Sequence, residues 1–290
     1  FEFVMDALML GVGVGFDTKG AGKITIKSPE KGVTVFQIPD NREGWVEALR
    51  IVLEAFFYGK ELPTFDYGLI RPAGTPIRGF GGIASGPAPL KDMLVNIHKI
   101  LDAKIGNPIT SLDILDIMNL IGKCVVAGNV RRSAEIALGE ATDLDFITSK
   151  QDEEKLYSHR WASNNSVFAI KGLDYTFIAN QIAVNGEPGI FWLDNAKAYS
   201  RMGDKPDYKD KKAAGVNPCG EQTLESFELC CLVETFPSRH DSYQEFQETL
   251  KFAYLYSKSV TLVNTHWQET NAVMLKNRRM GVSQTGIIEA

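Results

Sequence analysis

Residues 217–221 (Asn-Pro-Cys-Gly-Glu) bring a thiol, a carboxylate and an amide together within five positions. A cysteine and a glutamate two residues apart on an extended segment point to the same side, so Cys219 and Glu221 are expected to face one substrate. The carboxylate can then move a proton while the sulfur acts as the reacting atom. The pattern indicates radical or dithiol chemistry rather than hydrolysis; the alternative is a structural cysteine beside a loop glutamate.

A second pair of thiols follows closely. Cys230 stands eleven residues after Cys219, and Cys231 is directly beside it. The run 222–229 is short enough to fold back as a loop or hairpin and bring the sulfurs together. Spacing alone leaves open which of the two is a redox thiol, because an ordinary small core residue is the alternative reading of Cys231.

The composition excludes several classes of protein. The chain has 290 residues, of which 44% are hydrophobic and 23% charged, as in an ordinary soluble globular protein. Its net charge of −5 argues against general nucleic-acid binding. Four cysteines do not form a disulfide framework, no apolar run is long enough for a membrane, and no signal peptide opens the chain, so a reducing cytoplasm is expected. Both ends look truncated, which predicts a piece of a longer protein.

The hydrophobic periodicity predicts the elements that position these groups. We expect helices within 1–16 and 140–160 and over 45–57, 90–103, 111–122 and 242–261. We expect strands over 23–27, 33–38, 124–137, 166–170 and 189–193, the first two forming a hairpin. Asp40 and Ser111 are the expected N-caps, and 71–89 is loop. Helices that alternate with short apolar strands predict an α/β fold with a largely parallel sheet.

Two segments carry cations that need partners. Arg78 stands in a glycine-rich loop with Gly81 and Gly82, and Arg131 and Arg132 are adjacent on an apolar segment. A phosphate or a nucleobase edge would satisfy such guanidinium groups. For the first segment the alternative is a plain surface loop.

Other motifs fail their tests. Residues 11–15 (Gly-Val-Gly-Val-Gly) do not make a dinucleotide fingerprint, because Phe16 stands where glycine is required. Small residues there instead let a substrate ring approach the backbone. The four histidines are widely spaced and the cysteines form no C-x-x-C pair, so no metal site is expected.

The segment 217–226 and the later 230–237 (CCLVETFP) resemble ribonucleotide reductases, most closely the adenosylcobalamin-dependent, monomeric ribonucleoside-triphosphate reductases. The resemblance covers nearly the whole chain. It includes 9–16 (MLGVGVGF), 38–45 (IPDNREGW), 62–67 (LPTFDY), 74–82 (GTPIRGFGG), 127–134 (AGNVRRSA) and 276–281 (KNRRMG). Several separated motifs in the family's order are far more specific than one.

The resemblance implies a role for each candidate residue. Cys219 would carry a transient thiyl radical that abstracts the 3′-hydrogen of the ribose, and Glu221 would accept the 3′-hydroxyl proton. Asn217 would hold the substrate hydroxyls, and Cys230 would be one half of the reducing dithiol. Substrate-binding positions would be Gly13, Gly15, Pro218 and Gly220. Specificity loops that relay the identity of an effector would contain Arg78, Gly81, Gly82, Asn129, Arg131 and Arg132, with 40–50 in the effector-binding region.

The resemblance also implies an architecture and partners. It implies a ten-stranded α/β barrel of the ribonucleotide reductase and glycyl radical enzyme type, incomplete at both ends. Residues 1–290 would be part of a single catalytic domain with an effector-binding insertion around 17–70. It implies adenosylcobalamin (coenzyme B12) as cofactor, a ribonucleotide substrate, a deoxynucleotide effector, a thioredoxin-like reductant and a monomeric state. The family's other redox thiols fall outside this chain, so the chain alone is expected not to turn over.

Two rival hypotheses stay open. One is the catalytic subunit of a di-iron (class I) reductase, which has the same fold and a different radical source. The other is a nucleotide-binding module that has lost catalysis, which the intact Cys219 and Glu221 pair disfavours. The sequence also leaves open whether the substrate is a diphosphate or a triphosphate.

Overall fold

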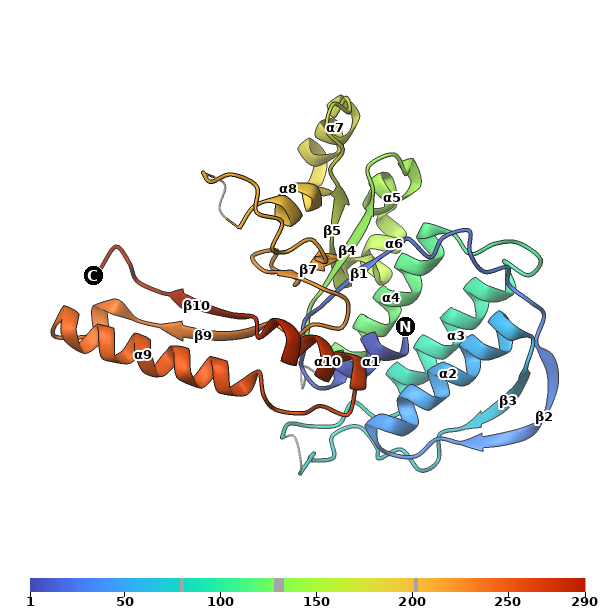
Figure 1. The fold of residues 1–290 in the computed structure, drawn as a ribbon. Helices are drawn as coiled ribbons and strands as arrows, with labels where there is room; N and C mark the ends of the chain where they lie inside the picture. The colour runs from blue at the N-terminus through green and yellow to red at the C-terminus, as the bar shows by residue number, and fades with distance from the viewer. Residues whose placement is uncertain (79–80, 128–132, 201–202, 290) are drawn as a thin grey trace. The chain divides into compact units, whose positions relative to one another are not determined.

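Four parallel strands form the main sheet in a computed structural model that describes residues 1–78, 81–127, 133–200 and 203–289. The strands β1, β4, β5 and β6 lie side by side in that order, and every neighbouring pair is parallel. Parallel strands need long crossover connections, and helices supply them here (Figure 1). The predicted α/β class with a largely parallel sheet is confirmed.

The chain divides into two compact units, Phe1–Trp192 and Leu193–Ala290. The elements of unit 1 are α1 (Glu2–Met9), β1 (Val14–Asp17), β2 (Glu30–Gln37), α2 (Arg42–Tyr58), β3 (Glu61–Asp66), α3 (Ala88–Asp102), α4 (Ser111–Val126), β4 (Glu135–Glu140), α5 (Leu144–Thr148), η2 (Ser149–Gln151), α6 (Glu153–Ser158), η3 (Arg160–Ala162), β5 (Ser163–Phe168), α7 (Thr176–Asn185) and β6 (Gly189–Phe191). The elements of unit 2 are α8 (Leu193–Ala198), β7 (Gly215–Val216), β8 (Thr223–Leu224), β9 (Cys231–Thr235), η4 (Pro237–Arg239), α9 (Tyr243–Val260), α10 (Gln268–Asn277) and β10 (Met280–Gln284).

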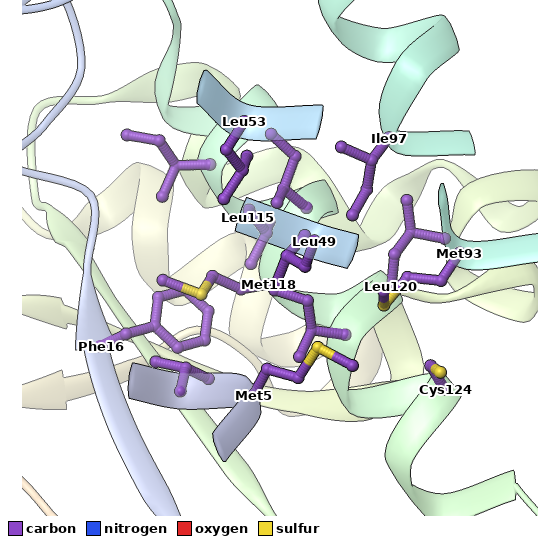
Figure 2. Packing of buried hydrophobic residues seen from close by; sticks show 14 of the residues in the cluster. Met5, Phe16, Leu49, Leu53, Met93, Ile97, Leu115, Met118, Leu120 and Cys124 are labelled. Carbon is purple, nitrogen blue, oxygen red and sulfur yellow. The ribbon is translucent and has the colours of Figure 1, made fainter. Parts of the chain in front are cut away.

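The core of unit 1 lies where α1, α2, α3 and α4 pack against one another. Each helix turns an apolar stripe inward, and Met5, Leu49, Ile97 and Leu115 are fully buried at their meeting point (Figure 2). Phe16 of β1 joins the same cluster and ties the helices to the sheet. The same core includes buried residues of β1, β4 and β5, so the helices and the main sheet share one interior.

The predicted N-caps are each wrong by one residue. Asn41 caps α2 by accepting from the N–H of Gly44, whereas the neighbouring Asp40 accepts a hydrogen bond from Nε of Arg71 at 2.6 Å. Thr110 rather than Ser111 caps α4, and it forms a capping box with the third residue of that helix.

The predicted hairpin of 23–27 and 33–38 is wrong. β2 pairs in parallel with β3, and the segment 23–27 pairs with the chain near 106–109, where the N–H of Ile26 donates to the carbonyl of Asn107 at 2.9 Å. An alternating pattern identifies an extended segment but does not select its partner.

The predicted strand over 124–137 is also wrong in its first part. Helix α4 continues to Val126, and β4 begins only at Glu135. Cys124 is buried, as predicted, but it lies on α4 at the edge of the helical core (Figure 2). A short apolar run fits a buried helix end as well as a strand, so periodicity could not separate the two.

The ten-stranded barrel is not confirmed. The strands of the described residues form one four-stranded sheet and three two-stranded sheets, and none of these closes. In unit 2, β9 and β10 form a parallel pair, and α9 packs against both strands (Figure 1). Among the helices that the structure describes, none is long and apolar enough to cross a bilayer.

Glu135, at the start of β4, is an unusual member of this interior. Its side chain is 2% exposed, and neither carboxylate oxygen has a hydrogen-bond partner among the described residues. It packs beneath Gly122 of α4, where an added Cβ would lie 2.9 Å from the carboxyl group. Burial raises the pKa of Glu135 well above its ordinary value, because the charged form has lost its water.

This burial predicts a pH-dependent stability. Below the ordinary pKa of glutamate both states hold the proton; above it only the folded state does, so the free energy of unfolding falls by about 1.4 kcal/mol per pH unit until the raised pKa is reached. Glu135→Gln removes this dependence and is expected to flatten the decline above the ordinary pKa of glutamate, measured by urea unfolding. Glu140→Gln, at the exposed end of the same strand, is the matched control. An equally steep decline in Glu135→Gln would contradict the assignment.

Candidate active site

A tight turn between β7 and β8 carries residues 217–221. The two strands are antiparallel, and the N–H of Gly220 donates to the carbonyl of Asn217 at 2.9 Å. Pro218 occupies the second turn position, which its fixed φ suits, and Gly220 has a φ of +82° that favours glycine. The prediction of an extended segment is therefore wrong, and the turn instead presents Cys219 at its tip.

The amide of Asn217 holds Glu221. Asn217 is buried, its Nδ2 donates to Oε1 of Glu221 at 2.7 Å, and its Oδ1 accepts from the N–H of Gln222 at 3.1 Å. Because both ends of the amide are engaged, the carboxylate has a defined orientation. The predicted contact of Asn217 with substrate hydroxyls stays a prediction.

Cys219 and Glu221 line one open groove of about 760 Å³ in unit 2. Both residues are exposed, so a substrate can reach the sulfur and the carboxylate from the same side. The remaining lining comes from β8, β9 and the start of β10: Gln222, Thr223, Leu232, Val233, Glu234, Arg279, Met280, Gly281, Val282 and Ser283.

Cys230 lies near this pair and is protonated at neutral pH. Its sulfur donates to Oε1 of Gln222 at 2.6 Å. Burial, followed by the charges of Glu221, Cys231 and Cys219, raises the pKa of Cys230 to about 12, against a smaller lowering by Arg279. The loop 222–229 thus brings this thiol within electrostatic reach of Cys219.

Cys231 occupies a different position. It begins β9, where it pairs with Met280 of β10, and burial raises the pKa of its thiol. The bond to Gln222 and the coupling to Glu221 belong to Cys230. The geometry therefore favours Cys230 as the thiol of the site.

Sequence reasoning missed two residues of this site. Gln222 holds Cys230, and its own Nε2 is buried without a partner among the described residues. Arg279 donates to Asp210 at 2.6 Å and to Glu228 at 3.0 Å, and it also lines the groove. The adjacent arginines in 276–281 were the available signal, but the sequence did not separate a helix end from a site residue.

The predicted residues of unit 1 fall in two places. Gly13 and Gly15 are exposed just before and within β1. Arg78 lines a separate cavity of about 590 Å³ together with Asp40, Arg42, Trp45 and Arg71, among others. The structure thus brings the predicted effector-binding segment and the predicted loop arginine to one cavity.

The glycines of that loop have a structural reason for their identity. Gly81 and Gly82 both have a φ of +82°, and their backbone bonds to Ile77 close a turn. The remaining predicted specificity residues Asn129, Arg131 and Arg132 lie outside the described residues. Within the described ranges, no group of three or more His, Cys, Asp or Glu side chains is arranged to hold a metal ion.

Comparison with known proteins gives a consistent result. The insertion domain of B12-dependent ribonucleotide reductase matches residues 17–101. A probable adenosylcobalamin-dependent ribonucleoside-triphosphate reductase of Dictyostelium discoideum is 51% identical over all of this chain and 41% of its own length. An adenosylcobalamin-dependent ribonucleoside-triphosphate reductase of Euglena gracilis is 52% identical over all of this chain and 40% of its own length.

A solved structure agrees with these relatives. The crystal structure of a B-12 dependent (class II) ribonucleotide reductase superimposes with a TM-score of 0.88 at 37% identity, over 99% of this chain and 45% of that one. The chain spans about two fifths of the length of the curated relatives it matches. Over its whole length the chain belongs to the adenosylcobalamin-dependent, class II ribonucleotide reductases, of which it represents a part.

Proposed function

We propose that this chain is the part of a ribonucleoside-triphosphate reductase that carries the radical cysteine and its proton acceptor. The reaction replaces the 2′-hydroxyl of a ribonucleotide by hydrogen; a dithiol is oxidised to a disulfide and the hydroxyl leaves as water. The observation that carries the proposal is that Cys219 and Glu221 share one groove and that Cys230 lies within electrostatic reach of both. The names of the curated relatives favour a triphosphate substrate.

The environment of each site residue suits one step of the proposed reaction. Cys219, exposed at the tip of the turn, takes the 3′-hydrogen atom as a thiyl radical, and Glu221 accepts the 3′-hydroxyl proton as general base. Asn217 keeps that carboxylate aimed into the groove and reaches the substrate hydroxyls once they enter. The departing 2′-hydroxyl must gain a proton, and Cys230, which carries one at neutral pH, can supply it.

The residues present fit adenosylcobalamin as the radical source. Adenosylcobalamin is a large cofactor that would have to approach the sulfur of Cys219. The open groove leaves that sulfur accessible. Leu232 and Val282 offer exposed apolar surface in the same groove to hold it. When bound, adenosylcobalamin supplies the radical that oxidises Cys219, which no side chain can generate unaided.

We further propose that the cavity of unit 1 binds a deoxynucleotide effector. Arg42, Arg71 and Arg78 bring three guanidinium groups to its wall, and Trp45 offers a flat surface for a base. Arg71 pairs with Asp40, and Arg42 pairs with Asp6 and Glu43. Arg78 forms no ion pair among the described residues, which leaves it available for a phosphate. The cavity includes residues of the segment that matches the family's insertion domain, in keeping with an effector-binding insertion around 17–70.

The complete protein would add what this chain lacks. We propose that the sheets described here belong to a ten-stranded α/β barrel in one catalytic domain, closed by further chain. The second redox thiol and the thiols that renew the dithiol would also come from outside these residues, with a thioredoxin-like protein as the electron donor. We propose that the enzyme is a monomer in the cytoplasm.

Replacing the radical cysteine tests the assignment directly. Cys219→Ser in the complete protein is expected to lower deoxynucleotide formation by at least about 1000-fold, because a hydroxyl does not replace the thiyl radical in hydrogen abstraction. Binding of a deoxynucleotide effector, measured by equilibrium dialysis, is expected to be unchanged. Retained reduction in this variant would remove Cys219 from the mechanism.

The radical source is testable without altering the chain. The complete protein mixed with adenosylcobalamin, a ribonucleoside triphosphate and a dithiol is expected to turn over with no second subunit, and to give an EPR signal of a thiyl radical coupled to cobalt. Turnover that requires a di-iron subunit instead would establish the class I alternative.

The environment of Cys230 predicts its reactivity. Alkylation of Cys230, followed residue by residue with mass spectrometry, is expected to keep accelerating above about pH 10, because only the thiolate reacts. Glu221→Gln is expected to shift this profile to lower pH, since removing a negative charge stabilises the thiolate. Glu234→Gln, in the same groove, is the control and is expected to leave it unchanged. A wild-type profile with the midpoint of a free cysteine would contradict the described environment.

A further inference from the structure

A second groove in unit 2 has no role in the reaction described above. It has a volume of about 640 Å³ and lies between the end of α8, the segment 209–212, β8 and the end of α10. Its lining residues are Ala196, Tyr199, Ser200, Lys209, Asp210, Lys211, Lys212, Thr223, Glu225, Lys276, Asn277 and Arg279.

The lining is basic on an acidic chain. Five lining residues are lysine or arginine and two are acidic, in a chain whose net charge is −5. Two further carboxylates pair with lining cations, Asp207 with Lys209 and Glu228 with Arg279, so the local excess is one positive charge. Charges gathered in a concave surface raise the local concentration of ions of opposite sign. The groove therefore attracts anions although the protein as a whole repels them.

The two acidic residues are already engaged. Glu225 accepts from Lys276 at 2.5 Å, and Asp210 accepts from Arg279 at 2.6 Å. Among the described residues, Lys211 and Lys212 form neither an ion pair nor a hydrogen bond, although both are adjacent along the chain and line the same space. The charge of Lys212 acts on the carboxylate of Glu225 and helps to lower its pKa, but no direct ion pair forms, so both ammonium groups can take an anion as a partner.

We propose that this groove binds a chain of phosphate groups, either a free polyphosphate or the triphosphate of a nucleotide. Ammonium groups act as point charges toward phosphate and do not demand one fixed geometry, which suits a ligand with several equivalent anionic groups. The volume lies within the range of small-molecule sites. The groove adjoins the one that contains Cys219, because Thr223 and Arg279 line both. The inference does not rest on the proposed function.

The test uses inorganic tripolyphosphate and isothermal titration calorimetry on the 290-residue chain. The wild-type chain is expected to bind, and the affinity to fall as NaCl is raised from about 0.05 M to about 0.3 M. The double variant Lys211→Gln with Lys212→Gln is expected to bind at least about 10-fold more weakly, because two charge-assisted contacts are lost. Circular dichroism melting of the variant checks that it still folds.

Two matched variants locate the site. Lys251→Gln removes one exposed charge from α9 of the same unit, and it is expected to leave the affinity unchanged apart from a small effect of net charge. Arg78→Gln changes the cavity of unit 1, the other candidate site for an anion on this chain. Tripolyphosphate binding that is weakened by Arg78→Gln but not by the double variant would overturn the proposal, as would the absence of binding by the wild-type chain.

A parallel titration with ATP separates the two sources of phosphate. Equal sensitivity of ATP and tripolyphosphate to the double variant indicates that the groove recognises the phosphate chain alone. Tighter binding of ATP that is lost in the double variant indicates a nucleotide. ATP and tripolyphosphate binding that both survive the double variant would show that the groove is not the site.

Discussion

The arrangement of the active-site groove depends on one guanidinium group. Arg279 directly precedes β10 and donates to Asp210 and to Glu228, so it joins the segment before the turn 217–221 to the segment after it. Burial opposes the charge of Arg279, but its hydrogen bonds to the two carboxylates outweigh that effect and raise its pKa. The side chain of Glu228 is fully buried, so removing Arg279 would leave a buried carboxylate with one partner fewer, which is costly.

The turn 217–221 lies between Asp210 and Glu228, the two residues that Arg279 joins, and it fixes the positions of Cys219 and Glu221. A reactive sulfur must be accessible, while the base beside it must not swing away. The fixed φ of Pro218 and the left-handed φ of Gly220 keep Cys219 exposed at the tip, and the buried amide of Asn217 holds the carboxylate of Glu221. The same carboxylate helps to keep Cys230 protonated, after the larger effect of burial. In the proposed mechanism, one negative charge thus serves as a base toward the sugar and also keeps a proton on the neighbouring thiol.

The two proposed sites lie in different units of the chain. Unit 2 contains the thiols and the carboxylate, whereas unit 1 contains the arginine-lined cavity proposed for the effector. In the proposed mechanism, an effector can influence catalysis only by binding two states of the protein with different affinity. Glu135, buried without a hydrogen-bond partner among the described residues, begins β4 shortly after the predicted specificity positions Arg131 and Arg132.

Much of the chemistry could be predicted from the sequence because the reacting groups are close along the chain. Residues 217–221 contain the thiol, the carboxylate and the amide, and the pairing of their side chains needs only one turn. The helices 42–58, 88–102 and 243–260 were also predictable, since an amphipathic helix buries its own apolar stripe whatever its neighbour is. The relatives add the family, whose motifs lie in the same order along this chain.

What the sequence alone determined, then, is the α/β class and the family, together with the candidate reactive groups of residues 217–221. Only the tertiary structure decided that β2 pairs with β3, that Asn41 rather than Asp40 caps α2, and that Gln222 and Arg279 complete the site. These contacts join residues that are far apart in sequence or choose between two neighbours with equal local propensity. The local sequence pattern does not predict these contacts, because their free energy depends on which distant group forms the hydrogen bond or the ion pair.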